Sequence, residues 1–122
     1  MATDLQVYDV SRIAGADLSA ALYFMMQLSA AKTVTLAGAA DADLYGILQN
    51  KPAASGRAAT VRRIGSSKLE IGDTVTFGDK LTSDVSGKGV PATSGQRYCA
   101  VALESGVDGD IISVEMEIGY VP

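Results

Sequence analysis

Residues 112–118 read Ile-Ser-Val-Glu-Met-Glu-Ile, so an apolar residue stands at every second position. Successive side chains of a β-strand point to opposite faces, and this spacing therefore predicts a strand with one face in a core and a charged face in solvent. The same alternation occurs in shorter form at residues 33–36 and 75–77. A period of two dominates the chain and indicates a β protein.

Two further stretches are apolar on both faces. Residues 98–103 run Tyr-Cys-Ala-Val-Ala-Leu, and residues 44–48 run Leu-Tyr-Gly-Ile-Leu. Strands with this pattern are expected to lie deep in a sheet or beneath another chain. Gly46 has no side chain, so it marks a place where a neighbouring backbone can approach closely.

Residues 17–31 fit two structures. In a helix, Asp17 would cap the first turn, and Leu22 and Met25 would share one side. In a strand, Leu22, Phe24 and Met26 would share one face, with Met25 opposite. The cluster of Tyr, Phe and two Met favours the strand, since aromatic residues are enriched in strands.

Short clusters of Gly, Asp and Ser separate the apolar runs, for example at 65–66, 86–89 and 108–110. Many short strands with frequent turns predict an all-β fold, either a small antiparallel β-barrel or a β-sandwich. The 122 residues suffice for one core and are too few for two. We expect a single β-domain over residues 17–122, preceded by an extended N-terminal arm over residues 1–16 that pairs with another element or subunit.

Gly-Asp pairs recur at 72–73, 78–79 and 109–110, each just before an apolar residue. Glycine permits the positive φ of a tight turn, and aspartate accepts hydrogen bonds from nearby backbone N–H groups. Carboxylates are also calcium ligands, but the acids here do not follow the alternating spacing of an EF-hand loop. We therefore interpret the pairs as turns and expect no metal site.

The charge is unevenly distributed. The net charge is −4, yet residues 51–68 carry five basic side chains and no acidic one. We expect no nucleic-acid partner, because phosphate neutralisation drives that binding and the chain is acidic overall. The longest apolar run, residues 20–26, is far shorter than the ~20 residues that span a bilayer, so no membrane partner is expected.

The sequence offers little for catalysis, and we expect no enzymatic activity and no cofactor. It contains no His, which removes the commonest general base and metal ligand. The single cysteine, Cys99, lies in an apolar run, where burial raises the thiol pKa and makes the thiol inert. Glu115 and Glu117 share a strand face, but a solvated face explains them better than a sugar-cleaving pair, because the chain has no Trp and few other rings.

The order of several segments carries a family resemblance. An opening at residues 17–28 is followed by the stretches 45–52, 56–61, 65–69, 78–84, 87–90, 100–104 and 109–114. This succession, over about residues 15–118, resembles the small capsid cement, or head-decoration, proteins of tailed bacteriophages and prophages. No single motif is diagnostic, and the order of the segments carries the likeness.

The resemblance implies a structural protein made in the bacterial host cytoplasm and placed on the outer capsid surface of the virion. Its partner would be the major capsid protein, and it would act as a homo-trimer that clamps neighbouring capsomers. The basic window is the candidate contact with an acidic shell, and the N-terminal arm is a second one. The predicted interface residues are Leu5, Val7, Tyr8, Lys51, Arg57, Arg62, Arg63 and Lys68. Arg62 and Arg63 are neighbours, so in an extended segment they point to opposite sides.

One alternative comes from another class of protein. A small β-module could bind a ligand, such as a carbohydrate, without any catalytic group. Sugar sites need exposed aromatic rings beside carboxylate or amide groups, and only five Tyr and two Phe could supply the rings.

Overall fold

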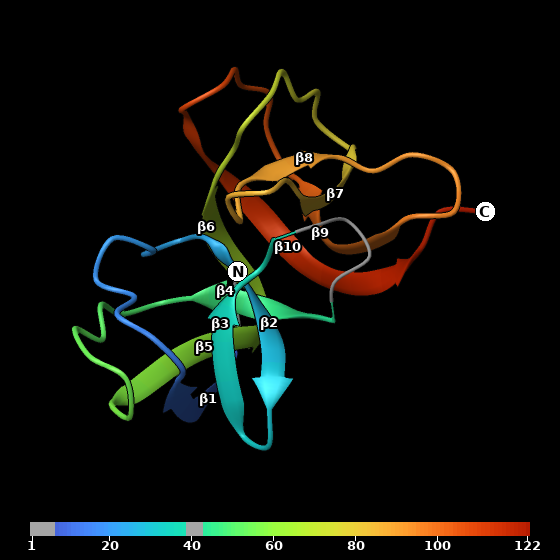
Figure 1. Ribbon diagram of the computed structural model, residues 1–122. Helices are drawn as coiled ribbons and strands as arrows, with labels where there is room; N and C mark the ends of the chain where they lie inside the picture. Colours follow the sequence, from blue (N-terminus) through green and yellow to red (C-terminus); the bar gives the residue numbers. More distant parts are fainter. Residues whose placement is uncertain (1–6, 39–42) are drawn as a thin grey trace, which may run out of the picture.

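The computed structural model describes residues 7–38 and 43–122 of the chain. These residues form two β-sheets that lie one above the other (Figure 1). The first sheet contains β1 (Tyr8–Ala14), β2 (Met25–Ala30), β3 (Thr33–Leu36), β4 (Leu44–Leu48) and β5 (Ala58–Ile64). The second contains β6 (Ser66–Glu70), β7 (Lys80–Ser83), β8 (Gly89–Pro91), β9 (Arg97–Ala102) and β10 (Ile111–Tyr120). The predicted all-β fold is therefore confirmed.

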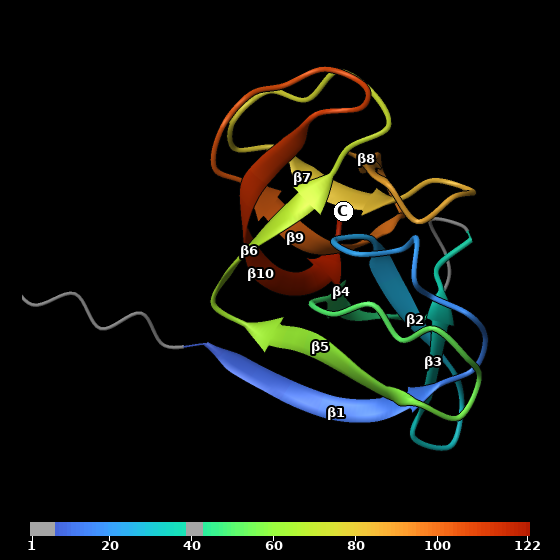
Figure 2. The same cartoon turned by 90° about the vertical axis from the view of Figure 1, so that its left-hand side faces the viewer.

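The first sheet is a closed barrel with strand order β1-β3-β2-β4-β5. Antiparallel pairing of β1 with β5 closes it, and β1 also pairs in parallel with β3. Figure 2 shows β1 and β5 side by side along one wall of the barrel. The second sheet has the order β6-β10-β9-β7-β8, with antiparallel pairing throughout.

Pairing of β1 within the chain corrects the predicted arm. The arm was expected over residues 1–16, but Tyr8–Ala14 is a strand of the barrel and pairs with β5 from Tyr8↔Ile64 to Ile13↔Ala58. Val10 and Ala14 are buried in the barrel, and this burial favours docking within the chain over an extended arm. Residues 1–6, which include Leu5, lie outside the described residues.

The core has two parts. Small and medium side chains fill the barrel, among them Val10, Ala14, Met26, Leu48, Ala59 and Val61. A second cluster joins the barrel to the second sheet and includes Met25, Leu44, Ile47, Leu69, Leu81, Cys99 and Val114. Strand β4 contributes to both parts, since Leu48 packs in the barrel and Ile47 against the second sheet. Strand β4 is apolar on both faces because one face packs in the barrel and the other against the second sheet.

The alternating and doubly apolar strands lie mostly where expected, but Ile118 and Leu103 are exposed rather than buried: the pairing of β10 with β9 shifts after Met116, and β9 ends at Ala102. In β10, Ile112 and Val114 are buried while Ser113 and Glu115 are exposed. Strand β9 runs between β10 and β7, so its backbone is paired on both sides. Gly46 packs against the β5 backbone, and a Cβ there would overlap the Arg62 carbonyl oxygen.

Two other expectations change. Residues 25–30 form the favoured strand β2, but residues 19–24 form turns rather than its beginning. Residues 75–77 form no strand, because Val75 makes an isolated bridge to Gly106 and Phe77 points into solvent. No helix in the described part of the chain is long and apolar enough to cross a membrane.

Candidate interaction surface

The basic window runs from the loop after β4 through β5 into β6. The structure separates its five cations into two groups. Arg62 and Arg63 are half-buried and engaged within the chain, whereas Lys51, Arg57 and Lys68 are exposed. None of the exposed three has an ion-pair partner among the described residues.

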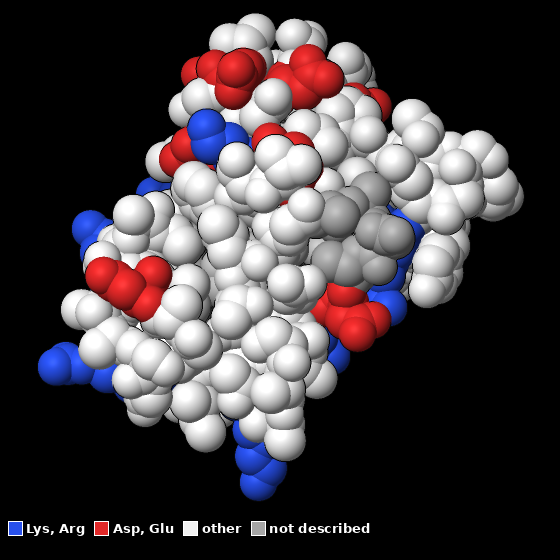
Figure 3. Space-filling model, in the orientation of Figure 1, with Lys and Arg blue, Asp and Glu red and all other residues white. Residues whose placement is uncertain are grey.

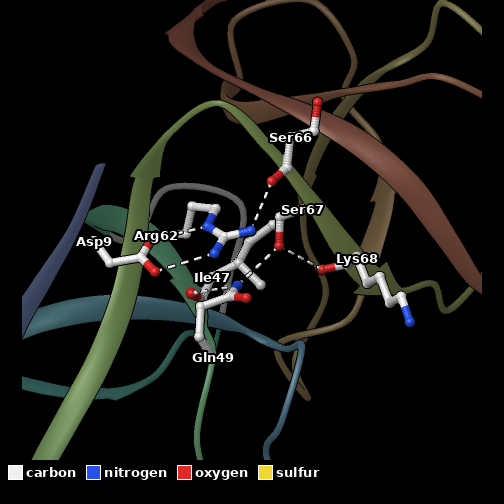
Figure 4. A network of polar contacts seen from close by, with 7 residues as sticks. All are labelled: Asp9, Ile47, Gln49, Arg62, Ser66, Ser67 and Lys68. Carbon is white, nitrogen blue, oxygen red and sulfur yellow. Dashed lines mark hydrogen bonds and ion pairs between the residues drawn. The ribbon is translucent and has the colours of Figure 1, made fainter. Parts of the chain in front are cut away.

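Arg62 holds the junction between the two sheets (Figure 4). Its Nε and Nη2 donate to the two carboxylate oxygens of Asp9 at 2.8 and 3.1 Å, and its Nη1 donates to the Ser66 carbonyl oxygen at 2.9 Å. The bonds to Asp9 raise the pKa of Arg62. A paired and hydrogen-bonded guanidinium gains less from a partner chain than a free one.

Arg63 points to the other side of β5, as the extended backbone predicts. Its guanidinium stacks 4.0 Å from the centroid of the Tyr45 ring, and its Nη1 donates to the Tyr45 carbonyl oxygen. From β1, the Arg12 Nε donates to the Tyr45 hydroxyl at 2.8 Å. Tyr45 thus contacts both arginines, so Arg63, a predicted interface residue, is engaged within the chain.

Lys68 lies beside a shallow pocket of about 270 Å³ at the seam between the two sheets. Its Nζ is 5.8 Å from the centroid of the Tyr23 ring. Within the pocket, Gln49 Nε2 donates to the Ser67 hydroxyl at 2.8 Å, and that hydroxyl donates to the Lys68 carbonyl oxygen (Figure 4). The lining contains no carboxylate, and the Ser67 proton is already donated to a backbone carbonyl oxygen.

A second hollow, of about 590 Å³, lies between residues 16–24 and the loop after β7. Its walls include Leu18, Phe24, Leu36 and Val85, so it is largely apolar. Asp17 lines one edge and accepts hydrogen bonds from the Ser19 hydroxyl and backbone N–H, which lower its pKa. Asp17 therefore organises a turn rather than the start of a helix.

The two other candidate reactive groups, Cys99 and Glu117, are buried or ion-paired within the chain. Cys99 is fully buried, and desolvation raises its pKa from the ordinary 9.0 to about 12, as the apolar run predicted. Arg63 and Arg97 oppose this shift through their charge. Glu117 forms an ion pair with Lys80 at 3.1 Å, and the bond lowers the pKa of Glu117.

Apolar side chains surround the start of β1. Val7 and Tyr8, both predicted interface residues, are exposed, and so is Ile64, the partner of Tyr8 in β5. Exposed apolar groups that lie together are typical of protein contacts. Among the described residues, the predicted interface residues that the structure leaves accessible are Val7, Tyr8, Lys51, Arg57 and Lys68.

Sequence reasoning missed another surface, which we call the loop tip. It consists of the loops at residues 71–79 and 103–110, at the upper end of the second sheet (Figure 1). Its exposed apolar side chains are Phe77, Leu103, Val107 and Ile111, the last at the start of β10. The three Gly-Asp pairs lie within these two loops, where Asp79 and Asp110 accept hydrogen bonds from the Thr76 and Val107 N–H groups, as the turn interpretation predicts.

The fold is similar to that in the crystal structure of the head fiber gp8.5 N base of bacteriophage phi29. The TM-score is 0.66, with 16% sequence identity over 92% of this chain and 95% of that chain. At this identity the likeness establishes a shared fold. No protein-family model matches the sequence, and neither does any curated protein.

Proposed function

We propose that this protein is a structural component of a tailed-bacteriophage head, bound to the outer surface of the mature capsid. The observation that carries the proposal is the likeness to the phi29 head fiber base, which extends over almost the whole of both chains. The order of segments in the sequence, which resembles capsid decoration proteins, points to the same setting. Because the likeness covers the whole domain and not one motif, it favours a similar role for the domain as a whole.

The proposed role is to stabilise the shell by joining neighbouring capsomers. Lys51, Arg57 and Lys68 would face an acidic shell surface, since they are exposed and have no ion-pair partner among the described residues. Val7 and Tyr8 would add apolar contact area. Arg62 and Arg63, by contrast, would support the barrel from within.

A homo-trimer would present the same surface three times. Three modest contacts in one rigid assembly gain strength from effective concentration without any one of them being strong. We also propose that the protein performs no catalysis, because the seam pocket places no acid–base pair beside a nucleophile.

The alternative of a carbohydrate-binding module is less well supported. The seam pocket has one aromatic ring, Tyr23, and Lys68 lies over that ring. A sugar face stacks on an uncovered aromatic ring, and Lys68 covers this one, so the pocket lacks a stacking surface for a sugar. A glycan-array screen with reproducible binding would revive the alternative.

Cosedimentation tests the proposal. Expanded, DNA-filled heads of the parent phage that lack this chain would be mixed with the purified protein. We expect saturable binding that weakens with salt, because exposed charge pairs are screened. The double variant Lys51→Glu/Arg57→Glu should bind at least about tenfold more weakly, a loss of 1.4 kcal/mol, whereas Lys32→Glu on the β2–β3 turn serves as a matched control. Absence of wild-type binding would reject the function, and unchanged binding of the double variant would reject the basic contact.

A further inference from the structure

We infer that the loop tip is a second docking surface, and that it fits a positively charged protein surface with an apolar hollow at its centre. This inference rests on the proposed attachment to a phage head. Each chain would then contact the head through two separate surfaces. The exposed cations Lys51 and Arg57 belong to the loop between β4 and β5, and the ribbon places this loop at the barrel end, far from the loop tip (Figures 1 and 2).

The two loops of the tip are tied to each other. Val75 and Gly106 exchange backbone hydrogen bonds of 2.9 and 3.0 Å, and Gly78 N–H donates to the Ala102 carbonyl oxygen at 2.8 Å. Phe77 N–H donates to the Ser105 hydroxyl at 3.1 Å. A surface already held in shape loses little conformational freedom on binding, which favours affinity.

The same rigid loops hold apolar side chains in solvent. Phe77 is 70% exposed, and Leu103, Val107 and Ile111 are 50, 56 and 51% exposed. Transfer of these apolar side chains from water into an apolar hollow of a partner would lower the free energy. An aromatic anchor surrounded by aliphatic groups is also the usual centre of a protein interface.

The charge around the tip determines the kind of partner. Asp73, Glu104, Asp108 and Asp110 are exposed on the two loops, Asp79 is partly exposed, and neither loop carries a Lys or Arg. Figure 3 shows acidic side chains gathered over this end of the molecule. Contact between the tips of two copies would place like charges together, which is unfavourable. A cationic rim around the apolar hollow would instead complement the tip.

Two variants test the inference on intact heads. Phe77→Ser removes the aromatic side chain of the tip, and Asp108→Lys reverses a charge whose carboxylate forms no hydrogen bond or ion pair with the described residues. Val85→Ser is the matched control, since Val85 is a loop residue that is 84% exposed and lies outside the tip. Thermal unfolding of each free variant checks that the fold is intact.

The readouts are affinity for heads and the temperature at which decorated heads release their DNA. We expect Phe77→Ser and Asp108→Lys each to weaken binding at least about tenfold and to abolish the gain in head stability. Val85→Ser should match the wild type in both. If the tip variants also match the wild type while the wild type binds heads, the inference is wrong and the proposed function stands. If the wild type does not bind heads, both are wrong.

Discussion

Arg62 of β5 holds the carboxylate of Asp9 of β1 in a two-bond ion pair, although 53 residues separate them in the chain. The pair lies on the outer side of the two strands whose pairing closes the barrel. The third bond of Arg62 reaches the Ser66 carbonyl oxygen at the start of β6, so one side chain links barrel closure to the second sheet. The two side chains are only 22 and 29% exposed, which limits screening by solvent.

This pair should contribute measurable stability. Arg62→Met keeps much of the aliphatic stem but removes all three bonds, and we expect a loss of about 1 kcal/mol in the free energy of unfolding, at the upper end for partly exposed pairs. Asp9→Asn should cost less, because Arg62 keeps its bond to Ser66. Urea unfolding measures both. Equal losses would contradict a separate contribution from the Ser66 bond.

Gly46 should tolerate no side chain. A Cβ there would overlap the Arg62 carbonyl oxygen and the Val61 Cγ1, both on β5, so Gly46→Ala would force β4 and β5 apart. We expect a loss of roughly 1–3 kcal/mol, as for other overpacked sites. Gly38→Ala is the control, since nothing lies within 4 Å of its Cβ position. Similar melting temperatures for the two variants would contradict the close packing of β4 on β5.

Cys99 should give the protein a dependence on alkaline pH. Burial raises the pKa of its thiol to about 12 in the folded chain, against an ordinary 9.0. The folded state therefore favours the neutral thiol. The contribution of the neutral thiol to the free energy of unfolding is fully present below pH 9. It is lost as the pH rises toward 12, by up to about 1.4 kcal/mol for each pH unit.

Chemical denaturation between pH 8 and 11 measures this effect, with Cys99→Ala as the reference. The variant should lose less stability over the range than the wild type, because its other titrating groups are the same. Parallel curves would show that the thiol does not titrate differently in the folded chain. In the native wild type, thiol reagents should react only on unfolding.

The proposed trimer predicts a mass in solution. Light scattering should give about three times the chain mass of 12.6 kDa. A mass of 12.6 kDa across the micromolar range would contradict a preformed trimer, while attachment to heads would be judged separately.

The features that could be predicted from the sequence are those that depend on residues close together in the chain. The alternating stretch at 112–118 lies in β10, most of the doubly apolar run at 98–103 lies in β9, and Gly46 lies where backbones meet. The Gly-Asp turns likewise depend on nearby backbone N–H groups, so their aspartates could be assigned from spacing alone.

The remaining features depend on contacts between distant segments. Strand β1 was mistaken for part of an arm because its partners lie some 50 residues later, in β5. The pairing of Arg62 with Asp9 has the same origin, and it engages a predicted interface residue within the chain. Phe77 was assigned to a strand face from two apolar residues, a run too short to separate a strand from a loop.

Electron cryomicroscopy of heads incubated with the purified chain tests the central claim most directly. We predict added density on the outer face of the expanded shell, between neighbouring capsomers, into which the barrel and the second sheet fit with both ends in contact with capsid protein. Density at any other location, or heads indistinguishable from undecorated ones at saturating protein, would contradict a role as a capsid-bound structural protein.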